Sequence, residues 1–275
     1  MILTKLQQSM ALAAGLLLIA GAGTASALSI SGDFSGADYN SPGVSLSGSA
    51  GWISDPGISP PYGLNPRLRL TGNSPGGQRG NAWLNTDTYR ADGAWTFDFT
   101  MQITYPQGGG ADGMGFHMHE AGLGADTWMR GEGLGATFLS VAFDSWNNGD
   151  DSPVDFGMVV YNNTLRSGSY VDLGASIGTP DPWQINVSLA YDGSGNLVVN
   201  VENDNTGATT GAINYAVNLA DLDEAIIGWS AHTGGATENH DIVDYAGTFA
   251  VPEPGTALLL GMGLSGLAWQ RRRTL

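Results

Sequence analysis

The sequence predicts an all-β fold in which two large antiparallel sheets pack face to face, and three observations predict it. The chain of 275 residues contains 42 glycines and 12 prolines, which is typical of short strands joined by tight turns. Its 8 Trp, 9 Tyr and 8 Phe side chains can fill the space between two sheets. Several segments alternate between apolar and polar residues, which is the period of a strand that buries one face.

The composition also excludes other classes of protein. Charged residues make up 13% of the chain and hydrophobic residues 42%, which excludes an acidic disordered polymer. A coiled coil or helical bundle would be richer in Ala, Glu, Lys and Leu. The absence of cysteine excludes a disulfide scaffold and any Cys-ligated zinc or iron–sulfur site.

A secretory signal peptide is predicted at residues 1–27. Lys5, the only lysine of the chain, precedes an apolar run at residues 10–22, and Ala25-Ser26-Ala27 has the small-x-small form of a cleavage site. Cleavage is predicted after Ala27. An uncleaved membrane anchor is the alternative, but the run is short and glycine-rich for a span of about 20 residues.

The strands are predicted in order along residues 28–251, which form one domain because no linker or repeat interrupts them. Residues 95–105 are apolar or aromatic at every odd position and polar at every even position. Residues 183–191 repeat this pattern, and a glycine-rich turn at 192–196 then leads to residues 197–201, which predicts a hairpin. Further strands are predicted at residues 138–143, 156–161, 225–230 and 245–251, and one helical turn at residues 219–225.

Four polar or glycine-rich clusters are predicted to lie in loops between these strands, at residues 108–116, 131–135, 143–155 and 232–241. The third contains four Asp and two Asn within twelve residues, and such oxygen ligands suit Ca²⁺. Its spacing is not that of an EF-hand, and a solvated acidic turn is the alternative. In the fourth, His232 and His240 are candidate metal ligands, although surface histidines usually are not.

Three motifs in these clusters occur in a fixed order. Ala111-Asp112-Gly113 is followed by Phe116, the glycine-rich residues 131–134 precede Ser-Val-Ala-Phe-Asp-Ser at 140–145, and residues 228–235 precede His-Asp-Ile at 240–242. Together they resemble the legume lectin-like (L-type lectin) family, particularly its bacterial branch, over about residues 83–249.

The resemblance implies a concanavalin-like jelly roll that binds sugar in a shallow site, with loops fixed by Ca²⁺. It implies a cis Ala111–Asp112 peptide, held by the calcium network, and an Asp112 carboxylate that accepts hydrogen bonds from two sugar hydroxyls. The implied carbohydrate-binding residues are Asp112, Gly133, Gly135, Trp146, Asn148, Gly234, Gly235 and Ala236, with Gly133 or Gly135 supplying a backbone N–H. The implied calcium ligands are Asp144, the Trp146 carbonyl, Asn148 and Asp151, with Asp150 as the alternative to Asp151.

Two positions depart from the family pattern. Ala142 stands where the family has a Glu that binds a transition metal, and Asp155 stands where it has a His. Mn²⁺ prefers sites that include imidazole and carboxylate ligands. Calcium alone is therefore expected, and Asp155 could still serve as an oxygen ligand.

A sorting signal is predicted at residues 252–275. Pro252-Glu253-Pro254 precedes a short apolar segment at 255–269 and three arginines at 271–273, which would hold that end in the cytoplasm. This order resembles the PEP-CTERM sorting signal of Gram-negative bacteria. The resemblance implies transient membrane anchoring, processing by an exosortase, and release to the cell surface or the exopolysaccharide matrix. A plain single-span tail anchor is the alternative.

The charge between the two ends bears on the partners. Residues 28–251 contain 6 Arg, no Lys and 25 Asp plus Glu, so their formal charge is −19. A field of this sign repels phosphates, so nucleic acid binding is not expected. The expected function is calcium-dependent carbohydrate binding by a secreted or surface-sorted protein. The expected partners are glycans or exopolysaccharide, and oligomer formation is left open.

An enzyme on the same fold is one alternative. A retaining glycoside hydrolase of this fold has Glu-x-Asp-x-x-Glu, but the aligned residues here are Ala142, Asp144 and Asn147. No spacing supports a pair drawn from the glutamates at 120, 132 and 238, so no catalysis is expected.

Two further alternatives remain. His117 and His119 share one strand face and are a candidate zinc site, against simple packing of the two rings. A structural matrix protein without glycan specificity is the other alternative.

Overall fold

The computed structural model describes residues 27–34, 43–53, 67–108, 110–120, 127–128, 130–135, 137–146, 156–163, 165–167, 170–173 and 183–250. The chain divides into two units, Met1–Leu28 with Ala250–Leu275, and Ser29–Phe249, and the fold below is that of the second unit. Nearly all of the predicted signal peptide and all of the sorting signal at 252–275 lie outside the described residues, as do Asn148, Asp150, Asp151 and Asp155. No helix within the described ranges is long and apolar enough to cross a membrane.

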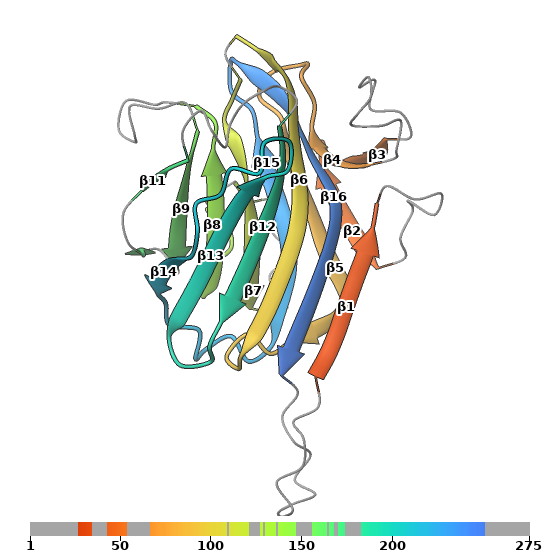
Figure 1. The fold of residues 1–275 in the computed structure, drawn as a ribbon. Coiled ribbons are helices and arrows are strands. Elements are labelled where there is room, and N and C mark those ends of the chain that lie inside the picture. The colour runs from red at the N-terminus through yellow and green to blue at the C-terminus, as the bar shows by residue number, and fades with distance from the viewer. Residues whose placement is uncertain are drawn as a thin grey trace, which may run out of the picture. The chain divides into compact units, whose positions relative to one another are not determined.

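Ser29–Phe249 forms two antiparallel sheets of eight strands each, as the sequence predicts (Figure 1). The β6 sheet consists, in spatial order, of β14 (Ile213–Ala216), β13 (Asn196–Asn203), β12 (Trp183–Tyr191), β6 (Trp95–Gln107), β16 (Thr237–Ala250), β4 (Arg67–Thr71) and β3 (Gly51–Ile53), with β1 (Ala27–Asp33) paired to β16. The β7 sheet consists of β10 (Leu165–Arg166), β9 (Gly157–Asn162), β8 (Phe138–Asp144), β7 (Gly113–Glu120), β15 (Ala225–His232), β5 (Arg79–Tyr89) and β2 (Val44–Gly48), with β11 (Val171–Asp172) paired to β9.

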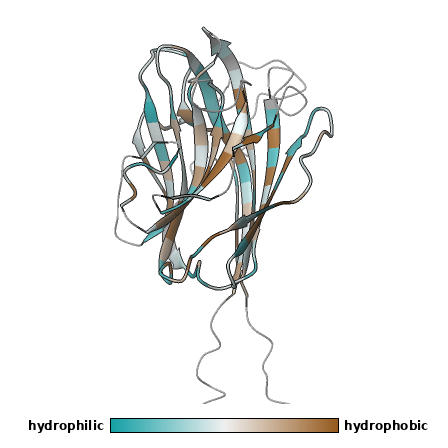
Figure 2. Ribbon diagram, turned by 90° about the vertical axis from the view of Figure 1, so that its left-hand side faces the viewer, coloured by the Kyte–Doolittle hydropathy of each residue, from teal (hydrophilic) through white to brown (hydrophobic). Residues whose placement is uncertain are grey.

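The core lies between the two sheets, and the strand period explains which side chains enter it. Phe97 and Phe99 on β6 are buried while the alternate Asp98 is exposed, and Figure 2 shows apolar and polar residues alternating along the strands. Phe97 packs against Phe116 of the other sheet with ring centroids 4.8 Å apart, and against Trp229 at 6.0 Å. Each aromatic pair of this kind adds about 0.5–1.5 kcal/mol to the burial of its rings.

The predicted strands are present as β6, β8, β9, β12, β13, β15 and β16, and the largest difference is in β16, which begins at Thr237 and not at the predicted Tyr245. The prediction of a helical turn at 219–225 is wrong. Leu222 N donates to Leu219 O at 3.0 Å in a simple turn, and Ala225 is already the first residue of β15. Leu219 and Leu222 both face the core from this turn.

A second, smaller apolar cluster lies on the opposite face of the β7 sheet from the core. It contains Trp83, Leu134 and Phe138, with Leu134 contributed by the loop that follows Thr127. The Trp83 indole lies over Gly228 of β15. A Cβ at this position would be 2.3 Å from the ring, so only glycine leaves room for the indole. The loop is therefore seated on this face by burial of its leucine.

His117 and His119 belong to this outer face, because they alternate with the core residues Phe116 and Met118. Both rings are buried. His117 Nε2 is 2.7 Å from Ser230 Oγ, and the His119 ring meets the Trp83 ring edge-on at 4.6 Å. Within the described ranges no group of three or more His, Asp or Glu residues could hold a metal, so these contacts favour packing over the zinc alternative.

The burial of His117 predicts a loss of stability in acid. Desolvation, with the neighbouring His119 as a second cause, lowers the pKa of His117 from its usual 6.5 to about 3. Below pH 6.5 the unfolded chain therefore takes up a proton that the folded protein does not. The free energy of unfolding should fall by about 2 kcal/mol from this group between about pH 7 and about pH 5.

Denaturant unfolding of the wild type and of His117→Gln at both pH values measures this contribution. The amide of Gln can keep a hydrogen bond to Ser230 but does not titrate, so the acid loss should be smaller in the variant. An equal loss in both proteins would show that His117 is not the group responsible.

Candidate functional site

Four strands of the β7 sheet bring charged residues to one edge of that sheet. His232, the last residue of β15, is paired on one side with Gly113 of β7 and on the other with Arg79 of β5. Gly113 is paired in turn with Asp144, the last residue of β8. Because neighbouring strands lie about 4.8 Å apart, Asp144, Asp112, His232 and Arg79 form a row across this edge.

Asp112 is held in this row by contacts on both its backbone and its side chain. Its N–H donates to His232 O at 2.8 Å, its carbonyl accepts from Ser145 N at 3.1 Å, and its Oδ2 is hydrogen-bonded to His232 Nδ1. The Ala111–Asp112 peptide is cis, as the resemblance implied. The carboxylate is partly exposed, so it is fixed in place and still open to solvent on one side.

A stack of three side chains lies beside Asp112. The Trp128 ring lies against the His232 ring with centroids 3.8 Å apart and 27° between the planes. The Arg79 guanidinium lies on the Trp128 ring, 3.9 Å from its centroid, which is a cation–π contact. Neither Arg79 nor Trp128 was picked out from the sequence. The register of β5 against β15 brings Arg79 to the site, and the loop between β7 and β8 brings Trp128 there.

Asp144 is fully buried and is compensated by an arginine. Its Oδ2 accepts from the Arg130 guanidinium, and its Oδ1 accepts from Trp146 N at 3.0 Å. The indole of Trp146, two residues further on, is 36% exposed. The strand end therefore buries a carboxylate and presents an aromatic ring to solvent next to it.

The loop that carries Arg130 lies on the outer face of the β7 sheet. Trp128 N donates to Glu132 O at 3.1 Å and Gly131 N to Trp128 O at 2.9 Å, which closes a tight turn. Gly131 has φ +87, and a Cβ there would lie 2.5 Å from the Phe138 ring, so only glycine fits. Gly133 and Gly135, two predicted sugar-binding residues, line with Arg130 and Phe138 a hollow of about 330 Å³.

The predicted specificity loop at 234–236 adjoins Asp112. A Cβ on Gly234 would lie 3.1 Å from Asp112 Oδ1, while nothing lies within 4 Å of one on Gly235. Ala236 faces Gly108, and Gly234 O accepts from Gly77 N at 2.9 Å. Gly234 thus leaves Asp112 Oδ1 uncovered, and a larger residue there would crowd it.

A buried polar network lies beneath the edge, where the sequence predicted a polar loop. That prediction is wrong for residues 237–241, because β16 begins at Thr237. Glu238 is hydrogen-bonded to Ser145 Oγ and, at 3.0 Å, to His240 Nε2, and His240 Nδ1 is 2.6 Å from Thr71 Oγ1. Both ring nitrogens of His240 are thus occupied by protein groups, which leaves no free nitrogen for a metal.

Two of the three glutamates considered for hydrolysis, Glu120 and Glu238, lie in different parts of the fold. Glu238 is buried in the network above, and Glu120 is the last residue of β7, at the opposite end of that strand from Asp112. The positions of these two residues therefore give no support to a pair of carboxylates flanking a sugar.

The described residues do not fit the calcium site that the resemblance implies. Ca²⁺ takes six to eight oxygen ligands, whereas a cation of the protein, the Arg130 guanidinium, is already bonded to Oδ2 of Asp144, and Asn148, Asp150 and Asp151 lie outside the described residues. The part of the chain that the structure describes holds no group of three or more His, Asp or Glu residues that could bind a metal. At the transition-metal position, Ala142 is fully buried and offers no ligand.

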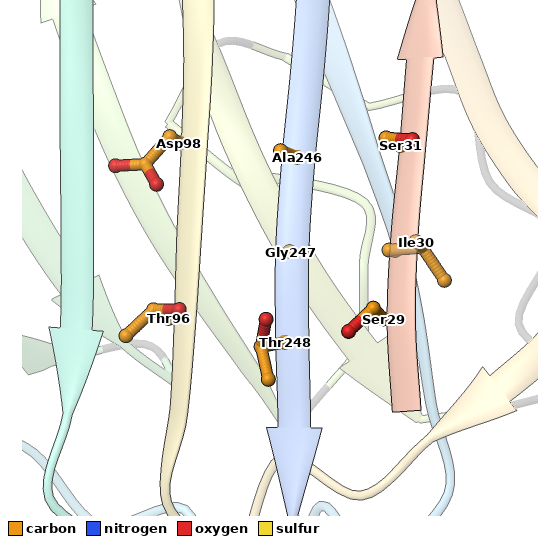
Figure 3. A pocket seen from close by; sticks show the side chains of 8 residues that line it. All are labelled: Ser29, Ile30, Ser31, Thr96, Asp98, Ala246, Gly247 and Thr248. Carbon is orange, nitrogen blue, oxygen red and sulfur yellow. The ribbon is translucent and has the colours of Figure 1, made fainter. Parts of the chain in front are cut away.

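Another hollow, of about 270 Å³, lies on the outer face of the β6 sheet (Figure 3). It is lined by small or hydroxylated residues of β1, β6 and β16, among them Ser29, Thr96, Thr248 and the carboxylate of Asp98. No aromatic side chain lines this hollow. The edge with Trp146 and Asp112 therefore offers the better combination of groups for a sugar.

Known proteins resemble this chain in its fold and in its C-terminal segment. Residues 250–273 match the PEP-CTERM protein-sorting motif, which indicates export and a surface or extracellular location. No curated protein sequence is a match to the chain.

Several solved lectin structures are similar. Peanut lectin with a 9mer peptide has 21% identity and a TM-score of 0.65, covering 84% of this chain and 100% of its own. Basic winged bean lectin with Tn-antigen has 21% identity and a TM-score of 0.64, covering 82% and 100%. The Bauhinia forficata lectin in complex with GalNAc has 19% identity and a TM-score of 0.64, also covering 82% and 100%. The chain therefore has a domain with the legume lectin jelly-roll fold, followed by a PEP-CTERM sorting motif.

Proposed function

We propose that the protein is a non-catalytic carbohydrate-binding protein that acts at the cell surface or in the exopolysaccharide matrix. The proposed site is the edge of the β7 sheet formed by Asp112, Trp146 and Gly234. The remaining proposed sugar contacts are the backbone of Gly133 or Gly135, the loop residues Gly235 and Ala236, and Asn148. Processing by an exosortase is proposed from the sorting motif at 250–273.

The exposed indole of Trp146 is the observation that carries this proposal. Among the described residues, Trp146 and Leu28 are the two large hydrophobic side chains that are exposed. Exposure of an indole to water costs free energy that a ligand can recover. The apolar face of a sugar ring is a suitable partner, because the ring stacks on the indole while its hydroxyls reach polar groups nearby.

Asp112 supplies the polar part of the proposed site. A carboxylate has about four lone-pair positions, and His232 uses one of them on Oδ2. Oδ1 faces Gly234, which has no side chain to cover it. Two sugar hydroxyls can therefore still donate to Asp112, and the bond to His232 holds the carboxylate in one orientation.

These features also favour binding over a purely structural role in the matrix. A scaffold has no need of a partly exposed carboxylate held by an imidazole, nor of an exposed indole beside it. A sugar can use both, because its ring stacks on the indole and its hydroxyls donate to the carboxylate. The calcium that the resemblance implies is not assumed in this proposal, since the Arg130 guanidinium is already paired with Asp144.

Replacing Asp112 by Asn should abolish most glycan binding. A hydrogen bond to a charged group contributes about 1.5–3 kcal/mol, so the affinity should fall by about 10- to 100-fold. A glycan array with the purified protein, followed by titration of the best ligand, measures this effect. Asp98→Asn is the matched control, because Asp98 is an exposed carboxylate on the other sheet. Equal binding by Asp112→Asn and the wild type would remove Asp112 from the site.

Replacing Trp146 by Ala should weaken the same ligand by roughly tenfold, because the stacking surface is lost. Trp146→Phe should keep most of the affinity, since a smaller aromatic face remains. Because the indole is partly exposed, the thermal unfolding midpoint should change little in either variant. A variant Trp146→Ala that binds as tightly as the wild type would contradict a stacking role.

A further inference from the structure

Asp144 poses an electrostatic problem that the protein must solve in order to fold. Its side chain is fully buried, and an ionised carboxylate taken out of water costs several kcal/mol unless a cation or several hydrogen bonds compensate it. In the resemblance that cation is calcium. In this chain the Arg130 guanidinium is bonded to Oδ2 of the same carboxylate.

Arg130 is directed at Asp144 by a loop that is fixed at several points. Thr127 N donates to Asn81 Oδ1 at 3.1 Å, which ties the start of the loop to β5. The Trp128 ring is stacked on His232, and the buried Leu134 anchors the end of the loop. The backbone on either side of Arg130 is therefore anchored, and it holds the arginine within reach of Asp144.

A divalent cation would compete with this guanidinium for the same oxygens. Metal binding at Asp144 would set a second cation against the Arg130 guanidinium on Oδ2, while Oδ1 already accepts from the Trp146 N–H. The next carboxylate in the row, Asp112, is already bonded to His232. Among the described residues Arg130 is the cation paired with Asp144, and a calcium ion there would add two positive charges beside it.

We propose that Arg130 takes the place of calcium in this domain, so that the sugar-binding edge is formed without a metal ion. Arg130 is then a positioning residue: it neutralises Asp144, which in turn fixes the backbone of Trp146. The consequence for ligand binding rests on the proposed function. The consequence for stability does not, and it can be measured on its own.

The first experiment measures thermal unfolding of the full-length purified protein in calcium and in excess EDTA. The wild-type midpoint should be the same in both. A midpoint that falls in EDTA and returns with calcium, in the wild type but not in Asp144→Asn, would overturn the proposal. Direct calcium titration separates the same two outcomes. If calcium binds the wild type and Asp144→Asn equally well, Asp144 is not a calcium ligand.

Variants then test whether the charge of Arg130 matters. Arg130→Gln should lower the midpoint by roughly 10 °C, since it leaves a buried carboxylate without its cation. Arg130→Lys should recover part of this shift. The double variant Arg130→Gln with Asp144→Asn should recover most of it, because both charges are then absent; a loss of packing alone would not be recovered. If Arg130→Gln unfolds as the wild type does, the proposal fails.

Arg90→Gln is the matched control. Arg90 also forms an ion pair, with Asp92, but its side chain is exposed, and exposed pairs contribute little to stability. Its midpoint should stay close to that of the wild type. A fall as large as that of Arg130→Gln would show that the assay reports general loss of charge and not the burial of Asp144.

The glycan array separates this inference from the proposed function. Equal binding in calcium and in EDTA supports both. Binding in calcium alone keeps the proposed function and overturns the role of Arg130. If no glycan binds in either condition, the proposed function fails, and the unfolding midpoints still decide whether Arg130 or calcium neutralises Asp144.

Discussion

The burial of acidic side chains at one edge of the β7 sheet is the constraint on which the rest of the site depends. Asp144 and Glu238 are buried and Asp112 is partly so, and each needs a partner of its own. Asp144 has Arg130, Asp112 has His232, and Glu238 has Ser145 and His240. A buried carboxylate without its partner would destabilise the folded edge, because the charge would then favour conformations in which water reaches it. The pairs are therefore needed for the edge to fold as observed.

These pairs also determine what the edge presents to solvent. Because Asp144 accepts from the Trp146 backbone, the chain turns outward there and leaves the indole exposed. Because His232 takes one oxygen of Asp112 and Gly234 lies against the other, one side of that carboxylate faces solvent. The same electrostatic requirement that stabilises the edge thus leaves an aromatic ring and a hydrogen-bond acceptor exposed at one edge of the sheet, and these are the groups of the proposed sugar site.

Much of the fold could be predicted from the sequence, because a strand with one buried face has a local pattern of alternating apolar and polar residues. β6 and β12 alternate strictly, and their predicted starts at Trp95 and Trp183 match. The start of β16 was missed because residues 238–241 are polar. Their side chains can be buried only because they form hydrogen bonds and ion pairs with residues elsewhere in the fold. At the site, Asp112 and Gly234 followed from the resemblance. Arg130 did not, because its role is a contact across 14 residues, and the bond between Asp112 and His232 spans 120.

The pairs at this edge matter more to stability because the chain has no cysteine and so no disulfide bonds, although its sorting motif indicates export. Without disulfides, and with a half-buried arginine where the resemblance has a metal, the fold outside the cell depends on its core and its internal ion pairs. Such pairs differ in how they respond to their surroundings. The exposed Arg90–Asp92 pair is screened by salt, whereas Asp144 is fully buried beside Arg130 and is screened much less. A carboxylate neutralised by a side chain of the same protein, as Asp144 is by Arg130, does not depend on the calcium concentration of its surroundings.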